Sequence, residues 1–180
     1  MAQTKTYNSY LADKVALRVD HLPKGRELYV LDCFAGKGLI WSAVRELTGR
    51  KITTLPIDMN QDSGFRLPGD NRAYLDTMDL DPFQVIDLDA YGIPYDQLKI
   101  IFEREYVGAV FVTFIQAINQ NLPLGMLQEL GFHKDMIKSI PTLFSKKGWG
   151  YFLEWLALRG VDQIWHRSHG QKHYLFFQAR

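Results

Sequence analysis

Stretches that look like buried strands alternate along this chain with stretches that have the periodicity of helices. The strand-like stretches lie at residues 27–34, 51–58, 83–89 and 108–115, and the first is nearly continuous in apolar residues, as in parallel strands. Helical patterns lie at residues 8–22, 38–49 and 95–106, the first with Asn8 as a plausible N-cap. Strands that alternate with helices imply right-handed crossovers and a mostly parallel sheet.

The remaining segments extend this α/β pattern. Residues 59–82 indicate a loop, a poor short strand near 65–67 and a short helix from Asn71. Two or three helices are expected between residues 122 and 160, and a β-hairpin around residues 169–171 ends the chain. We therefore expect a single domain over residues 1–180, a three-layer sandwich around a seven-stranded, mostly parallel sheet with a terminal antiparallel hairpin.

Composition narrows the cellular setting. Cys33 is the only cysteine, so no internal disulfide can form, and a buried, inert thiol is the expected state. No run of 18 apolar residues is present, and the first 14 residues lack the apolar segment of a signal peptide. These features predict a cytoplasmic protein without a membrane span.

Charge is distributed unevenly along the sequence. The net charge is +1, but residues 131–180 hold eight Lys/Arg against three Asp/Glu, whereas the first 130 hold thirteen against seventeen. A basic C-terminal third is suited to the phosphates of RNA or DNA, and it is equally compatible with an ordinary solvated surface.

The stretch "LDCFAGKGL", residues 31–39, is the strongest candidate for a ligand site. It lies where the first strand meets its helix, and ligands of open parallel sheets bind at such strand ends. A phosphate-binding loop of the Walker type would need Ser or Thr after Lys37, and the next residue is Gly38. A dinucleotide fingerprint would need glycine at position 41, which is Trp41.

The remaining pattern is an acidic residue followed by x-F-x-G-x-G, which "DCFAGKG" fits fully. Here the chain resembles the class I S-adenosylmethionine (SAM)-dependent methyltransferases. The resemblance implies that SAM is the cofactor, with its methionine end beside the acid and packed on the glycine backbone. The residues that match are Asp32, Phe34, Gly36 and Gly38.

Two further pairs of residues correspond to positions of this family. Asp58 ends the second strand, where the family places an acid that binds both ribose hydroxyls, and Met59 follows it. A carboxylate can accept hydrogen bonds from two neighbouring hydroxyls, although a loop-capping aspartate is the ordinary alternative. Asp70 and Asn71 correspond to the positions near the adenine, and Asp70 is equally suited to be the N-cap of the next helix.

The end of the fourth strand carries the candidate chemistry. "VIDLDAYGIP", residues 85–94, resembles the corresponding motif of the tRNA guanine-26 dimethyltransferases. That resemblance implies that Asp89 accepts hydrogen bonds from a target amine and that Tyr91 stacks on the base, a contact of about 1–3 kcal/mol. Ala90 stands where that family has proline, which is expected to loosen the turn. Duty in a cap or turn is the ordinary alternative for Asp89, and loop packing for Tyr91.

For two other groups of residues we favour a purely structural interpretation over a functional one. His166, His169 and His173 straddle the expected hairpin without a companion pattern of metal ligands, so no metal site is predicted. Lys146 and Lys147 precede Trp149, a combination that suits a nucleic-acid strand, but the tryptophan is expected to begin the core face of a helix.

Together these features predict a SAM-dependent methyltransferase that acts on a nitrogen of a nucleic-acid base. One alternative is a methyltransferase of the same fold that acts on a small molecule or a protein side chain. The other is a non-catalytic SAM-binding or partner module, which the alanine in the strand-four motif would suit.

Overall fold

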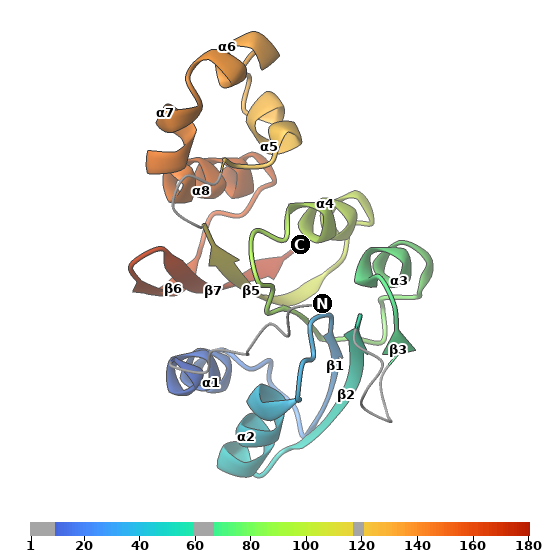
Figure 1. The fold of residues 1–180 in the computed structure, drawn as a ribbon. Coiled ribbons are helices and arrows are strands. Elements are labelled where there is room, and N and C mark those ends of the chain that lie inside the picture. The colour runs from blue at the N-terminus through green and yellow to red at the C-terminus, as the bar shows by residue number, and fades with distance from the viewer. Residues whose placement is uncertain (1–9, 60–66, 117–120) are drawn as a thin grey trace.

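A seven-stranded sheet forms the centre of the computed structural model, which describes residues 10–59, 67–116 and 121–180 (Figure 1). The strand order is β3-β2-β1-β4-β5-β7-β6. The pairs that join β3, β2, β1, β4 and β5 are parallel, and β7 runs antiparallel to both β5 and β6. The strands are β1 (Glu27–Asp32), β2 (Lys51–Asp58), β3 (Leu67–Pro68), β4 (Val85–Leu88), β5 (Gly108–Ile115), β6 (Trp165–His169) and β7 (Lys172–Ala179). The predicted fold class is confirmed.

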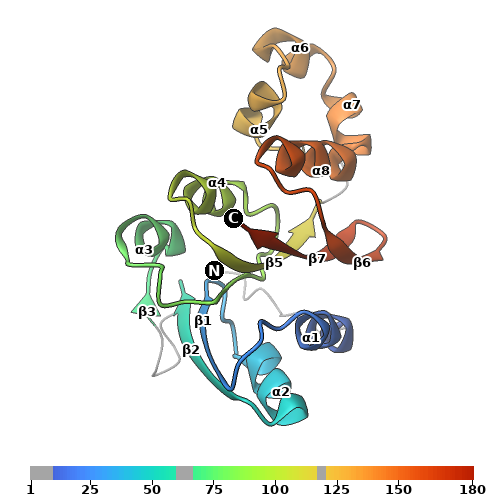
Figure 2. The same ribbon diagram turned by 180° about the vertical axis from the view of Figure 1, so that it is seen from behind.

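Helices cover both faces of this sheet (Figure 2). One apolar cluster joins the first two helices to the sheet, and a second, larger cluster joins the third, fourth and last helices to its other face. The helices are α1 (Leu11–Asp20), α2 (Leu39–Thr48), α3 (Asn71–Thr77), α4 (Tyr95–Glu103), α5 (Leu124–Glu129), α6 (Lys134–Ser139), α7 (Pro141–Lys146) and α8 (Gly148–Leu158).

The central strands are buried on both faces, which explains their continuous apolar sequences. All four residues of β4 and seven of the eight in β5 are buried. Because β1, β2, β4 and β5 are parallel, their carboxyl ends meet at one edge of the sheet, which we call the carboxyl edge. The hairpin between β6 and β7 reaches the same edge, since Ile115 pairs with Lys172 and Lys172 with His169.

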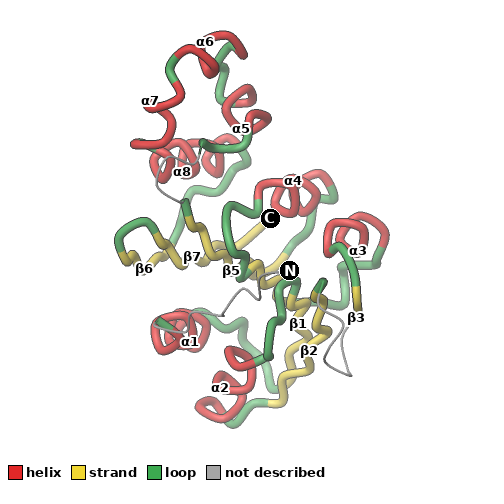
Figure 3. The backbone as a smooth tube through the Cα atoms, in the orientation of Figure 1, coloured by secondary structure: helices red, strands yellow, loops and turns green. Residues whose placement is uncertain are grey.

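Several element boundaries differ from the sequence-based expectation. The strand expected near residues 65–67 is only two residues long, and residue 65 and the expected cap Asn8 lie outside the described residues. The segment after β5 contains four helices instead of two or three (Figure 3). The extra break falls between α6 and α7, because Pro141 has no N–H and restricts the residue before it.

In the part of the chain that the structure describes, no helix combines the length and apolar character required to cross a bilayer.

Candidate active site

Two glycines shape the bend between β1 and α2. Gly36 has φ 47° and Gly38 has φ 70°, a left-handed conformation that side chains with a Cβ rarely adopt. Gly38 is the N-cap of α2, and its N–H donates to the carbonyl of Ala35 at 2.7 Å. The bend therefore presents bare backbone at the carboxyl edge, as the sequence predicted.

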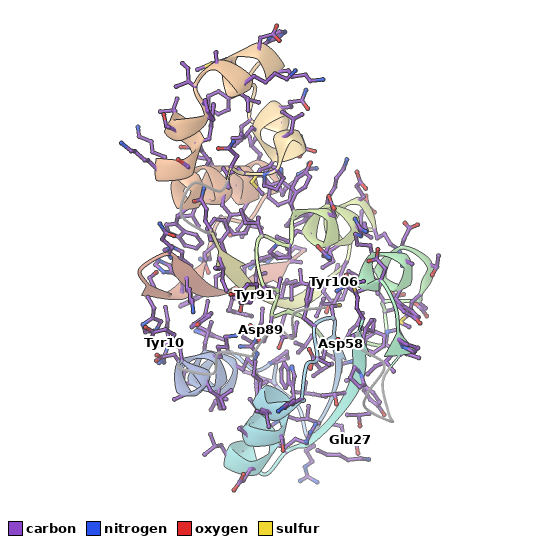
Figure 4. The ribbon with its side chains drawn as sticks, viewed as in Figure 1. Tyr10, Glu27, Asp58, Asp89, Tyr91 and Tyr106 are labelled. Carbon is purple, nitrogen blue, oxygen red and sulfur yellow. The ribbon has the colours of Figure 1, made fainter. Side chains whose placement is uncertain are left out.

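Asp58 is tied directly to this bend. Its Oδ2 accepts a hydrogen bond of 2.7 Å from the backbone N–H of Gly36, 22 residues earlier in the chain. A carboxylate has about four acceptor positions, so this bond fixes the side chain and uses one of them. Met59, the next residue, is 78% exposed. Figure 4 shows Asp58 in the middle of the molecule, whereas Glu27, at the start of β1, lies at one end.

The candidates for the adenine end have partners within the protein. Asp70 caps α3, because its carboxylate accepts from the N–H of Arg72 at 2.9 Å and also pairs with the Arg72 guanidinium. Hydrogen bonds from Arg72 lower the pKa of the Asp70 carboxyl. Asn71 is buried, and its Nδ2 donates to the carbonyl of Cys33 at 2.6 Å. Phe34 is half-buried against the larger core cluster. The cap is therefore formed, and contact with an adenine remains a prediction.

A group of three carboxylates lies at the ends of β1 and β4. Asp87 is fully buried and forms a bidentate ion pair with Arg18 of α1. Its Oδ2 lies 2.7 Å from Nε and its Oδ1 lies 2.6 Å from Nη2. The indole N–H of Trp41 donates to the same carboxylate at 2.7 Å. Asp89 pairs with Lys14, also from α1. Asp32 is the third carboxylate, and it is buried at the end of β1.

The surroundings of Asp32 disfavour its ionised form. Burial raises the pKa of its carboxyl well above the usual value, and the nearby Asp87 and Asp89 raise it further. Arg18 and the backbone N–H of Phe34 oppose this shift but do not reverse it. The negative charge on Asp32 is therefore disfavoured by its surroundings, and a cationic group bound beside it would stabilise the ionised carboxylate.

Asp89, the predicted hydrogen-bond acceptor for a target amine, is already engaged. Nζ of Lys14 lies 2.6 Å from one of its oxygens and 2.8 Å from the other, and the hydroxyl of Thr113 donates to the first oxygen. The Asp89 side chain is 15% exposed and that of Lys14 is 18% exposed. Only about one acceptor position of the carboxylate is left for a further donor.

The two predicted catalytic residues, Asp89 and Tyr91, lie on either side of a turn and differ in how far their side chains are buried. Tyr91 is 79% exposed, and Ala90 between them is buried. The N–H of Ala90 donates to the carbonyl of Leu88 at 2.7 Å. A proline at position 90 could not make this bond, so the alanine belongs to a hydrogen-bonded turn and does not simply loosen the motif.

Sequence reasoning missed the residues of α1 that complete this site. The expected apolar face of residues 8–22 was defined by its aliphatic side chains, although Arg18 lies three residues after Val15 and so shares that face. Lys14 likewise lies three residues after Leu11. A cation within an apolar helical stripe was the available signal, and its partners lie 69 and 75 residues away.

The sequence predicted no metal site at the hairpin histidines, a core position for Trp149 and an inert thiol at Cys33. Among the described residues, no group of three His, Cys, Asp or Glu side chains is placed to hold a metal ion. His173 stacks on Trp149 with ring centroids 3.9 Å apart, and burial lowers the pKa of His173 to about 4. Trp149 is half-buried against the core, as the bland interpretation expected. Cys33 is buried, and burial raises the pKa of its thiol.

Solved structures with the same architecture are numerous. A possible exported protein of Bordetella parapertussis is 11% identical with a TM-score of 0.57, and the match covers 94% of this chain and 66% of that one. A proposed rRNA methylase from Clostridium thermocellum is 11% identical with a TM-score of 0.52, covering 97% and 100%. Precorrin-6y C5,15-methyltransferase from Geobacter metallireducens is 13% identical with a TM-score of 0.52, covering 100% and 93%.

This is the fold of the class I methyltransferases. At 11–13% identity these matches show a shared fold alone. The carboxyl edge described above is part of that fold. The sequence itself matches no protein-family model and no curated protein.

Proposed function

We propose that this protein binds SAM at the carboxyl edge of β1 and β2 and catalyses transfer of its methyl group. The observation that carries the proposal is the buried Asp32 carboxyl at a glycine bend, where burial and the nearby Asp87 and Asp89 raise its pKa, so that a cation bound beside it would stabilise its ionised form. SAM supplies an activated methyl group on a sulfonium cation and also carries an ammonium group, and both charges suit this environment. The methyltransferase fold supports the proposal.

The residues that would hold SAM follow from the geometry and the resemblance together. Gly36 and Gly38 would let the amino-acid end approach the backbone, with Asp32 as its anionic partner. Asp58 would bind the ribose from a position fixed by the Gly36 N–H. Phe34, Met59, Asp70 and Asn71 are the candidates for the remaining contacts.

For the acceptor, we propose a nitrogen of a nucleic-acid base, bound by Asp89 and stacked on Tyr91. The exposed Tyr91 ring supports this, because a splayed base can stack on an accessible aromatic face. The likeness to tRNA guanine-26 dimethyltransferases rests on residues 85–94 alone. The neighbours named above act on different substrates according to their descriptions, an rRNA and a precorrin, so the fold does not select between acceptors.

The Lys14–Asp89 pair favours a second candidate. An amine must share or displace the ammonium group of Lys14 to reach both Asp89 oxygens. A methyltransferase for a different acceptor, a small molecule or a protein side chain, would not require that exchange. A module that binds SAM without catalysis would not require it either. Labelled methyl transfer from SAM, lost in Asp89→Ala, distinguishes the first proposal from the non-catalytic module.

Calorimetric titration with S-adenosylhomocysteine tests the cofactor site. We expect about micromolar affinity, weakened about tenfold or more in Asp58→Ala and Gly36→Val, because hydrogen bonds to charged groups contribute about 1.5–3 kcal/mol. Gly49→Val is the matched control, since Gly49 has φ 62° at the other end of α2. Asp76→Ala, on the exposed surface of α3, controls for loss of a carboxylate. Unchanged affinity in both site variants would refute the assigned pocket.

A further inference from the structure

Residues 122–147, which precede α8, form an arm that stands away from the sheet. We call residues 122–147, with α5, α6 and α7, the helical arm; α6 and α7 lie at one end of the molecule (Figure 1). The apolar residues of the arm continue the larger core cluster, and Phe132 packs edge-on against Phe144 of the arm and Tyr151 of α8. It is a folded element with an outer surface that the sheet does not cover.

The unpaired positive charge of the C-terminal third is concentrated on this arm. Arg167 of the hairpin pairs with Asp13 and Asp20, and Arg159 of α8 pairs with Glu129. By contrast, four exposed lysines on the arm and at its end have no ion pair among the described residues. They are Lys134, Lys138, Lys146 and Lys147. The structure thus separates neutralised basic residues from available ones, which the sequence could not do.

We propose that these four lysines bind the phosphate backbone of a single-stranded nucleic acid. Charge complementarity supports this partner, because these four lysines outnumber the one exposed carboxylate of the arm, Asp135, and a surplus of positive charge attracts a polyanion. The lysine surface stands independently of methyl transfer. The single-stranded form rests on the function proposed above, since a base inside a duplex cannot present its atoms to an active site.

The layout of α6 argues against a membrane as the partner. Lys134 and Lys138 are four residues apart and share one side of the helix, whereas Met136 and Ile140 lie on the opposite side. Met136 is 39% exposed and Ile140 is 44% exposed. A lipid surface would have to contact the lysines and the apolar side chains together, and one flat surface cannot reach both sides of the helix. A polyanion needs the lysine side alone.

The arm ends at the carboxyl edge of the sheet. Gly148, after Lys147, lies against the side chain of Gln116, which follows β5, and a Cβ at Gly148 would force that side chain to move. Trp149 stacks on His173 of β7. The next residue, Tyr174, points to the opposite face of the sheet, where its ring lies 5.1 Å from the Lys14 Nζ that binds Asp89. A nucleic acid held by Lys146 and Lys147 would therefore have to cross the carboxyl edge to reach Asp89.

Fluorescence anisotropy with a labelled single-stranded RNA of about 16 nucleotides tests the surface. In a variant with all four arm lysines replaced by glutamine, we expect affinity to fall at least tenfold. The slope of log affinity against log salt should become shallower by about 3, from about 0.7 per lost phosphate contact. The matched control compares Lys146→Gln, Lys147→Gln with Lys24→Gln, Arg26→Gln, because Lys24 and Arg26 are also exposed and have no ion pair among the described residues; this control should bind like the parent protein.

Three results would overturn the proposal: no RNA binding by the parent protein at low salt, equal losses in the control variant, or binding of anionic lipid vesicles instead of RNA. Equal affinity for a duplex of the same sequence would overturn the single-stranded form. Titration of the arm variant with S-adenosylhomocysteine keeps the two proposals apart. Cofactor binding should be unchanged, and its absence in the parent protein would remove the proposed function while leaving the lysine surface tested by RNA.

Discussion

Lys14 holds Asp89 by both carboxylate oxygens, at 2.6 and 2.8 Å, although the two residues lie 75 positions apart. The first helix thus closes over the turn that the sequence singled out for chemistry. Whether an acceptor binds there depends on this ion pair as well as on the aspartate itself.

Replacing Lys14 with methionine should destabilise the protein by about 2 kcal/mol. The Asp89 carboxylate would stay partly buried without its cation, and an uncompensated polar group costs about 1–3 kcal/mol. Urea unfolding measures the change. The control Lys51→Met removes an exposed pair with Glu27 and should have a smaller effect. If both variants unfold alike, the Lys14–Asp89 pair has no special role in stability.

The buried Arg18–Asp87 pair should behave differently in single and double variants. Arg18→Met leaves Asp87 buried without its cation, so we expect a loss of about 3–5 kcal/mol. The double variant Arg18→Met, Asp87→Leu removes both charges and should recover most of that loss, because buried pairs often exchange with apolar residues at little cost. With the single variant Asp87→Leu as the third member, the unfolding free energies from denaturant titrations give the coupling between the two residues. Additive losses would show that Arg18 and Asp87 do not stabilise each other.

His173 should make the stability of the protein depend on pH in the acid range. Its folded pKa is about 4, below the ordinary 6.5, so the unfolded chain takes up a proton first as pH falls. The free energy of unfolding should therefore decrease from about pH 6.5 to pH 4 and lose this dependence below that range. Unfolding curves of His173→Gln should be flatter across the same range. The exposed His133→Gln is the control, and a slope unchanged by His173→Gln would contradict the prediction.

Glu129 anchors the helical arm to the rest of the molecule. Its carboxylate accepts from the Tyr95 hydroxyl at 2.8 Å, from the Trp155 indole at 2.7 Å and from Arg159. Glu129→Gln removes the charge that binds Arg159, so amides of α5 should exchange faster with deuterium while those of β4 stay protected. Hydrogen exchange read by mass spectrometry tests this. Glu103→Gln, from an exposed pair on α4, should leave α5 unchanged.

Local patterns were sufficient to predict the sheet and the glycine bend. The bend depends on neighbouring glycines, and the parallel strands depend on continuous apolar runs. Both features can therefore be recognised in short stretches of sequence. The partners of Asp87 and Asp89 depend on contacts across 69 and 75 residues, which no local pattern encodes. The helix break at Pro141 could have been predicted from the proline itself. The division of the arm into three short helices depends on packing around Phe144.

The Arg18 and Lys14 contacts also bear on how the molecule is assembled. A helix made early in synthesis must wait for β4 before its charges find their partners, so these pairs belong to the slow, long-range contacts of folding. Until β4 has joined the sheet, Arg18 and Lys14 lack the carboxylates of Asp87 and Asp89. A ribosome-bound chain that ends before Asp87 would thus contain the whole "DCFAGKG" stretch and still lack the Asp87 and Asp89 carboxylates that lie beside it in the folded protein.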